Sequence, residues 1–166
     1  MADASWAVVY PGDPFPENAV KALGRNLQCT EEKGCDVYVA LWQRDDGEPV
    51  FGRCWNEEGK AKAVFPYGGA AIPESEILGF RVLTYQGGPA DNGFEYRWMK
   101  TAEADPNTMF YVGDLVPCVV YCEGEGESLG KAKPADKQCW TCQGGNEVYH
   151  CDQDYEHTYV LCKISS

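Results

Sequence analysis

The sequence lacks a long hydrophobic run. Nowhere in its 166 residues does an apolar stretch approach the roughly 20 residues that a transmembrane helix needs. Residues 1–6 also lack the basic region followed by an apolar stretch that marks a secretory signal. We therefore expect a cytoplasmic protein without membrane insertion, and the sequence leaves release or surface exposure open as an alternative.

Positive charge is also scarce. Lys and Arg number 14 against 26 Asp and Glu, which gives a formal net charge of −12. Phosphate backbones bind surfaces rich in Lys and Arg and are repelled by an acidic one, and an anionic membrane surface behaves in the same way. We predict that the protein binds neither nucleic acid nor membranes.

The residues that carry acid–base chemistry form no recognisable catalytic pattern. Only two histidines are present, His150 and His157. The sequence contains no Gly-rich phosphate loop of the strand–GxxxxGK–helix type, and nothing marks a Cys/His pair as a nucleophile and its base. We therefore predict a protein that is not an enzyme and needs no cofactor.

Helical periodicity is weak throughout the chain. No long stretch places apolar residues at i, i+3, i+4 and i+7, as an amphipathic helix requires. Short β-rich runs separated by Gly, Pro and Asp dominate instead, a pattern typical of a sandwich or barrel. The runs are residues 6–10, 37–43, 50–54, 61–65, 80–85, 94–100, 118–122, 139–142 and 158–163. We predict an all-β fold.

The sequence also contains an internal repeat. Trp6, Asp13-Pro14, Gly52-Arg53, Gly68-Gly69 and Val82-Leu83 recur in the same order as Trp98, Asp105-Pro106, Gly130-Lys131, Gly144-Gly145 and Val160-Leu161. A fixed order of matched features indicates an internal duplication. Because a half of about 80 residues buries little core alone, we expect one compact unit. We predict a first repeat at residues 1–86 with an inserted loop around 27–35, a short connector at 87–92 and a second repeat at 93–166.

Nine cysteines are ambiguous in a chain without an export signal. The default is a cytosolic protein with reduced thiols, which pack as small apolar side chains in a β core. Cys29 and Cys35 flank the predicted insertion, and a disulfide between them would close it in an oxidising compartment.

A zinc site is an alternative use of the cysteines. Cys139 and Cys142 form a C-x-x-C motif, and His150 or Cys151 could complete a tetrahedral set of ligands. A strong zinc signature needs two well-spaced pairs, and residues three apart on a strand point in different directions. We therefore predict no metal site and keep these four residues as weak candidates.

The two copies share four motifs in a fixed order. Each begins with Trp and a nearby Pro and Asn, continues into Gly and a basic residue, then reaches a double glycine, and closes on Val-Leu. The residues are Trp6, Pro16, Asn18, Gly52-Arg53, Gly68-Gly69 and Val82-Leu83, and Trp98, Pro106, Asn107, Gly130-Lys131, Gly144-Gly145 and Val160-Leu161.

This order resembles the DM-nine repeat, which is found in tandem in small invertebrate proteins and at the N-terminus of natterin-like toxins. The resemblance covers nearly the whole chain. It implies an all-β, β-sandwich-like unit in which two repeats pack with pseudo-two-fold symmetry. It also implies a mannose-binding lectin that recognises glycans on microbial or cell surfaces in innate immunity.

The resemblance places a sugar site in the second copy. In lectins of the family, an early acidic residue and the lysine of Gly-Lys hold the sugar, which indicates Asp114 and Lys131, with Glu147 and Trp140 nearby. A carboxylate accepts hydrogen bonds from sugar hydroxyls and an ammonium group donates them. An aromatic ring can cover the apolar face of the sugar.

The corresponding positions of the first copy are Asn26 and Arg53, with Tyr67 or Trp55 as the aromatic residue. The acid is therefore missing there, and Arg and Lys are not equivalent donors. We expect the second site to be the stronger of the two.

Other interpretations stay open. The main alternative is an intracellular protein-interaction or stress-response module of the same fold that has lost sugar binding. Asp114 and Lys131 would then form an ordinary surface ion pair, which contributes little. A homodimer is a further possibility, because weak sites gain avidity when they are combined.

Overall fold

The computed structural model describes residues 4–29, 35–122, 126–151 and 153–165. Within these ranges the chain is mainly extended. The strands are β1 (Ser5–Val9), β2 (Tyr38–Gln43), β3 (Pro49–Glu57), β4 (Lys60–Tyr67), β5 (Ala70–Pro73), β6 (Phe80–Thr84), β7 (Phe94–Lys100), β8 (Val116–Cys122), β9 (Gly126–Lys133), β10 (Gln138–Gln143), β11 (Asn146–Cys151) and β12 (Tyr159–Ser165). The helices are short: η1 (Ala22–Gly24), η2 (Glu74–Glu76), α1 (Pro89–Asn92), η3 (Pro106–Thr108), η4 (Pro134–Asp136) and α2 (Gln153–Glu156).

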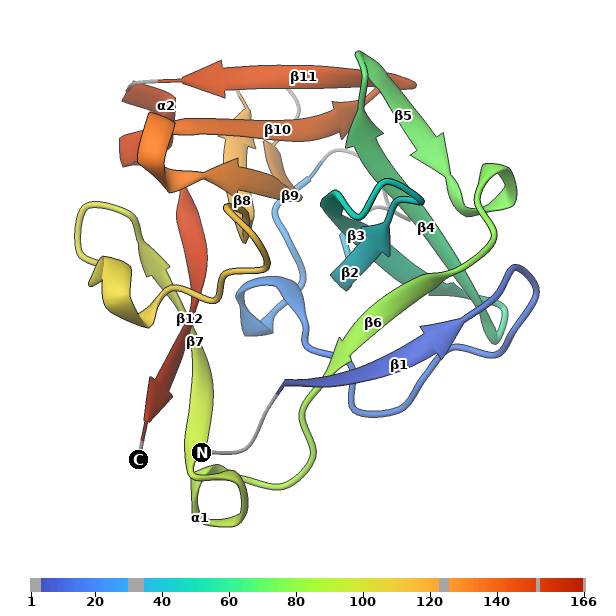
Figure 1. Cartoon of the computed structure of the whole chain (residues 1–166), viewed down its shortest axis with the longest axis horizontal. Coiled ribbons are helices and arrows are strands. Elements are labelled where there is room, and N and C mark those ends of the chain that lie inside the picture. The colour runs from blue at the N-terminus through green and yellow to red at the C-terminus, as the bar shows by residue number, and fades with distance from the viewer. Residues whose placement is uncertain (1–3, 30–34, 123–125, 152, 166) are drawn as a thin grey trace.

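The described strands form one antiparallel sheet, in the order β1-β6-β2-β3-β4-β5-β11-β10-β9-β8-β12-β7 (Figure 1). Read from the β7 end, the second half has the order β7-β12-β8-β9-β10-β11, and read from the β1 end, the first half has the order β1-β6-β2-β3-β4-β5. Each strand of the second half therefore corresponds to the strand of the first half whose number is six lower. The register repeats as well, because Trp6 lies opposite Leu83 and Trp98 opposite Leu161. The predicted all-β fold, with two repeats in pseudo-two-fold symmetry, is confirmed.

Three hydrophobic cores hold the sheet together. One belongs to the first half, one to the second half, and the third takes residues from both. The repeated Val-Leu pairs divide between them: Val82 and Val160 pack in the core of their own half, whereas Leu83 and Leu161 pack in the shared core. Adjacent strand residues point to opposite faces, so the face of each half that carries this leucine packs against the other half.

Gly52 and Gly130, which precede the repeated basic residues Arg53 and Lys131, lie where the backbone passes close to the next strand. A Cβ atom at Gly130 would lie 2.0 Å from the carbonyl oxygen of Trp140, and one at Gly52 would lie 2.3 Å from that of Val64. The β9–β10 pairing ends at the residue after Gly130. Glycine is thus required at both positions by the space available to the backbone.

The two halves join edge to edge at their double-glycine turns. The Ala71 N–H donates to the Gly145 carbonyl at 3.1 Å, and the Glu147 N–H donates to the Gly69 carbonyl at 3.1 Å. Gly69 and Gly145 have φ values of 86° and 85°, which favour glycine. The joint brings β5 beside β11 and makes the sheet continuous (Figure 1).

Nine strands lie where the sequence predicts them, within a few residues at each end. The prediction misses β5, β9 and β11, whose segments are short or rich in Ala, Gly and polar residues. Residues 30–34 of the insertion predicted around 27–35 lie outside the described residues. The predicted connector at 87–92 contains the whole of α1, and the repeat boundaries stay a prediction.

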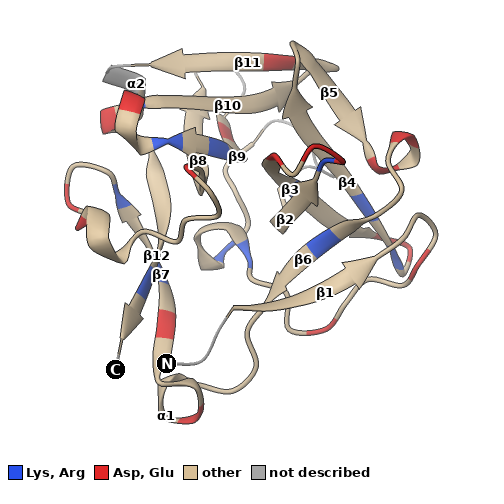
Figure 2. Ribbon diagram, in the orientation of Figure 1, with Lys and Arg blue, Asp and Glu red and all other residues tan. Residues whose placement is uncertain are grey.

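Many of the acidic residues lie in turns and short helices, and a few lie on strands such as β7 and β11 (Figure 2). They accompany Lys and Arg residues that lie mostly on strands. In the part of the chain that the structure describes, no helix has the length and apolar character needed to cross a bilayer.

Candidate functional site

A cavity of about 390 Å³ opens at the junction of the two halves. Its volume lies within the range of about 300–1,000 Å³ that is usual for ligand sites. Both halves contribute to its wall, which contains charged and aromatic residues. The lining residues are Glu48, Pro49, Tyr67, Gly68, Asp114, Leu115, Lys131, Lys133, Gln138, Trp140 and Glu147.

The pairing of the second-half strands aligns one side of this cavity. Lys131 of β9 lies opposite Trp140 of β10, and two residues further along β10, Cys142 lies opposite Glu147 of β11. Residues two apart on a strand share a face. Lys131, Trp140 and Glu147 therefore project to the same side of the sheet.

The other walls come from the turn before β8 and from the end of β4. Asp114 lies in a tight turn before β8, in which Val112 and Leu115 exchange backbone hydrogen bonds of 2.9 and 3.2 Å. Tyr67 ends β4 of the first half and reaches the cavity because β5 pairs with β11 across the joint. The cavity thus depends on the assembly of both halves.

Lys131 is the most enclosed charged group of the cavity, with 8% of its surface exposed. Its ammonium nitrogen lies 3.3 Å from Glu147 Oε2, 5.4 Å from the centroid of the Tyr67 ring and 5.3 Å from that of Trp140. Glu147 Oε1 also accepts a hydrogen bond of 3.0 Å from the Gly69 N–H. The carboxylate and two aromatic rings compensate the charge of Lys131.

Lys133 is the second lysine of the cavity, and it is paired as well. Its ammonium nitrogen lies 3.1 Å from Asp136 Oδ2. The hydrogen bond and charge of Asp136 raise the pKa of Lys133, and the charge of Asp114 adds to this effect. Both lysines therefore already have carboxylate partners.

The structure brings the four residues predicted for the second copy, Asp114, Lys131, Glu147 and Trp140, to one cavity. It adds Tyr67, which the sequence analysis assigned to the first copy. The sequence alone could not assign Tyr67 to this cavity, because the other predicted residues that line it belong to the second repeat.

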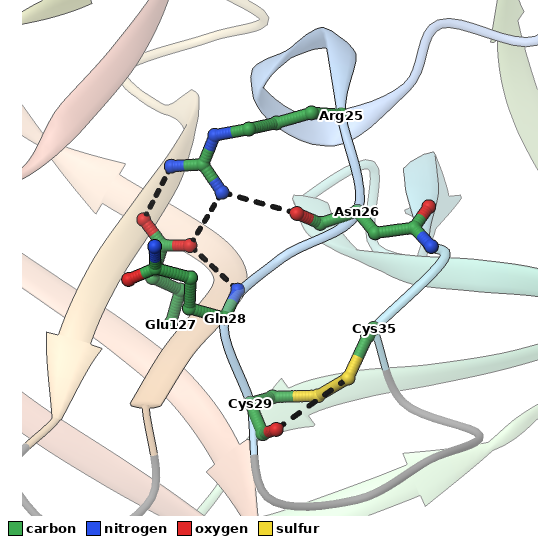
Figure 3. Close-up of polar contacts among 6 residues, drawn as sticks. All are labelled: Arg25, Asn26, Gln28, Cys29, Cys35 and Glu127. Atoms are coloured by element: carbon green, nitrogen blue, oxygen red, sulfur yellow. Dashed lines mark hydrogen bonds and ion pairs between the residues drawn. A yellow bond between two sulfur atoms is a disulfide. The ribbon is translucent and has the colours of Figure 1, made fainter.

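Asn26 and Arg53, the polar residues predicted for the first copy, do not line this cavity. Arg53 instead points between the halves, where it donates hydrogen bonds of 3.1 Å to Ser128 Oγ and to the Cys142 carbonyl. Asn26 is exposed and its side chain points away from the neighbouring ion pair of Arg25 (Figure 3). Arg53 is thus a structural contact, because its strand face turns toward the second half.

The ion pair beside Asn26 was missed by sequence reasoning. Arg25 donates to both carboxylate oxygens of Glu127 on β9, at 2.8 and 2.9 Å, and the Gln28 N–H donates to Glu127 at 2.7 Å (Figure 3). Burial raises the pKa of Glu127, but the hydrogen bonds from Arg25 and Gln28 outweigh it, so the pKa lies below its ordinary value. The pair links residues 102 positions apart, and no local signal reveals it.

The weak metal candidates are not gathered into one site. Cys139 is buried in the core of the second half, whereas Cys151 is exposed. Burial raises the pKa of Cys142 to about 12, so its thiol stays protonated. His150 Nε2 lies 3.1 Å from Thr141 Oγ1. Among the described residues, no group of three or more His, Cys, Asp or Glu is placed to hold a metal ion.

Cys29 and Cys35 form a disulfide at the base of the predicted insertion (Figure 3). The other seven cysteines lie outside this disulfide, and six of them are buried. The β core therefore accounts for most of the cysteines, in line with the expectation of small apolar side chains.

Comparison with known proteins identifies the family. Residues 3–165 match the family model described as MFP2b, cytosolic motility protein. Among solved structures, the chain is similar to the crystal structure of the nematode sperm cell motility protein MFP2B, with 34% sequence identity and a TM-score of 0.88. The match covers 98% of this chain and 46% of the other, so this chain spans less than half of its length. No curated protein matches the chain.

These findings correct the functional prediction. The DM-nine resemblance, the mannose-binding lectin, its glycan partners and the role in innate immunity are wrong, because the family is one of motility proteins. The motifs behind the resemblance serve this fold: the glycines permit close crossings and tight turns, and Val-Leu divides between two cores. The predicted cytoplasmic location is confirmed by the family description. The chain belongs to the MFP2b family of cytosolic motility proteins.

Proposed function

We propose that this protein is a non-enzymatic component of a cytosolic motility system and that it acts by binding a partner protein in the cavity between its halves. The match of residues 3–165 to a motility family carries the proposal. The similar solved structure is that of a sperm cell motility protein, which supports the same cellular role.

The geometry of the cavity supports a binding role. Its aromatic walls, Tyr67 and Trp140, offer flat apolar surface, and its charged groups offer donors and acceptors for specific hydrogen bonds. Its main polar groups sit on paired strands and a tight turn, so they are held in place before a partner arrives. Such preorganisation lowers the cost of binding.

One close Cys–His contact bears on the choice between binding and catalysis. Cys122 Sγ lies 3.8 Å from His150 Nε2, as in a nucleophile–base pair. Cys122 and His150 are 9% and 8% exposed, however. A substrate would have to displace the surrounding side chains to reach the sulfur, so this contact supports packing and not catalysis.

The proposal is tested by genetic replacement in cells that express the protein. We expect disruption of the gene to slow the crawling of these cells and the wild-type protein to restore their speed. Asp114→Arg, which places a cation in the mouth of the cavity, should fail to restore it. Glu17→Arg makes the same change of charge at an exposed site of the first half and should restore it fully.

Two results would count against the proposal. Normal crawling after disruption would remove the motility role. Full rescue by Asp114→Arg, at wild-type protein levels, would show that the role does not depend on the cavity.

A further inference from the structure

The charged residues that line the cavity differ in whether they have an ion-pair partner. Three carboxylates and two lysines line it. Lys131 is paired with Glu147, and Lys133 with Asp136. Asp114 is exposed, and among the described residues it makes no ion pair within 4.0 Å. The unmatched charge of the cavity is therefore negative.

An anionic ligand fits this arrangement poorly. It would have to take Lys131 or Lys133 from an existing carboxylate partner, and the freed carboxylate would then repel it. A cationic group meets the opposite situation, because Asp114 can accept its hydrogen bonds without breaking an ion pair. The net charge of −12 also draws positively charged partners toward the molecule.

The aromatic wall favours one kind of cation. The molecule already holds a guanidinium group against Tyr67: the Arg44 Cζ lies 4.0 Å from the centroid of that ring, and Arg44 Nη1 lies 3.4 Å from Glu48. A planar guanidinium stacks on aromatic faces and pairs with both oxygens of a carboxylate, whereas an ammonium group is a compact point charge. Trp140 and Asp114 offer the same combination of ring and carboxylate inside the cavity.

We propose that the cavity binds an arginine side chain presented by a basic segment of a partner protein. The guanidinium donates hydrogen bonds to Asp114 and lies against the ring of Trp140. Lys131 also lies over the Trp140 ring, with its ammonium nitrogen 5.3 Å from the ring centroid, and Glu147 at 3.3 Å offsets its charge. This inference rests on the proposed function and names the chemistry of the partner that the same cavity accepts.

The test measures the binding of fluorescein-labelled peptides by fluorescence anisotropy at physiological salt. The three peptides alternate glycine with arginine, with lysine or with glutamate. We expect the arginine peptide to bind most tightly, the lysine peptide more weakly and the glutamate peptide not at all. In parallel, the indole N–H resonance of Trp140, assigned with the Trp140→Phe variant, should shift with the arginine peptide.

A matched pair of variants separates the cavity from general attraction to an acidic protein. Asp114→Asn should weaken binding of the arginine peptide about fivefold, the effect of an exposed charge pair. Asn keeps the turn, because it tolerates the same backbone conformations as Asp. Glu17→Gln changes the net charge equally at a distant exposed site and should leave the affinity unchanged.

The outcomes are distinct from those of the motility experiment. Equal affinities of Asp114→Asn and Glu17→Gln, an unshifted Trp140 resonance, or tight binding of the glutamate peptide would each overturn the arginine proposal. If Asp114→Arg nevertheless fails to rescue crawling, the motility role stands and the cavity accepts a different group. Loss of the motility role with intact peptide binding would overturn the proposed function alone.

Discussion

Replacement of Gly130 by alanine tests the role of the repeated Gly-basic motif. The added Cβ would lie 2.0 Å from the Trp140 carbonyl oxygen and 3.1 Å from the Thr141 Cα. Both contacts are with backbone atoms, so no side-chain rotation relieves them. The β9 and β10 strands must therefore move apart by about 1 Å or more, since ordinary carbon–oxygen contacts begin near 3.4 Å.

The size of the effect follows from what this movement breaks. Ladder hydrogen bonds have donor–acceptor distances of about 2.7–3.2 Å, so a shift of 1 Å removes those next to Gly130. Each contributes about 0.5–1.5 kcal/mol, and overpacking costs a further ~1–3 kcal/mol. We expect Gly130→Ala to lower the free energy of unfolding by about 3 kcal/mol or more.

Urea unfolding followed by tryptophan fluorescence measures this change, with Gly144→Ala as the control. Gly144 has a φ of 56° and no atom within 4 Å of an added Cβ. Alanine there pays only for its left-handed backbone, about 1–2 kcal/mol. Gly52→Ala should behave like Gly130→Ala, because its Cβ would lie 2.3 Å from a carbonyl oxygen. A Gly130→Ala protein no less stable than Gly144→Ala would refute the reasoning.

Three further predictions concern the contacts between and beside the halves. Glu127 has a pKa below its ordinary 4.5, so its pair with Arg25 stabilises the fold above that pH and is lost as the pH falls through the lowered value. Glu127→Gln should lower the free energy of unfolding by about 1 kcal/mol at pH 7, because the half-exposed Arg25 is screened by solvent. The difference from wild type should shrink by pH 3. Urea unfolding at both pH values checks this, and an equal difference at both would contradict it. Reduction of Cys29–Cys35 with dithiothreitol should lower stability by about 2 kcal/mol, because the closed loop is short, whereas Cys29→Ser should not respond to the reductant. Arg53→Met should cost about 1–3 kcal/mol by removing two hydrogen bonds to the second half; an unchanged urea midpoint would show that these bonds are exchanged for water without loss.

Much of the fold could be predicted because strand periodicity and turn residues are local signals. The strands that were missed are those whose stability comes from other strands. β5 contains only four residues, Ala70–Pro73, and β11 begins at the polar Asn146. These two strands pair across the joint of the halves, and a sequence read locally does not contain that pairing.

The candidate site was predictable in part for a similar reason. Lys131 follows from the repeated Gly-basic motif, and strand pairing places Trp140 opposite it. Tyr67 and Glu48 enter the cavity from the first half, which no motif of the second half indicates. The predicted sugar ligand was wrong because the Gly-basic and Gly-Gly pairs are needed for backbone geometry. Folds with different functions share such needs.

The shared core determines which part of the chain can fold as an independent unit. Leu83 of the first half and Leu161 of the second are both fully buried there. The chain joins the two halves through a short stretch around α1. That link raises the local concentration of one half near the other but supplies none of the buried contacts. The two halves thus pack as the subunits of an obligate dimer do, although they are consecutive in one chain. Two separately expressed halves should be unstable alone and should reconstitute the native sheet when they are mixed.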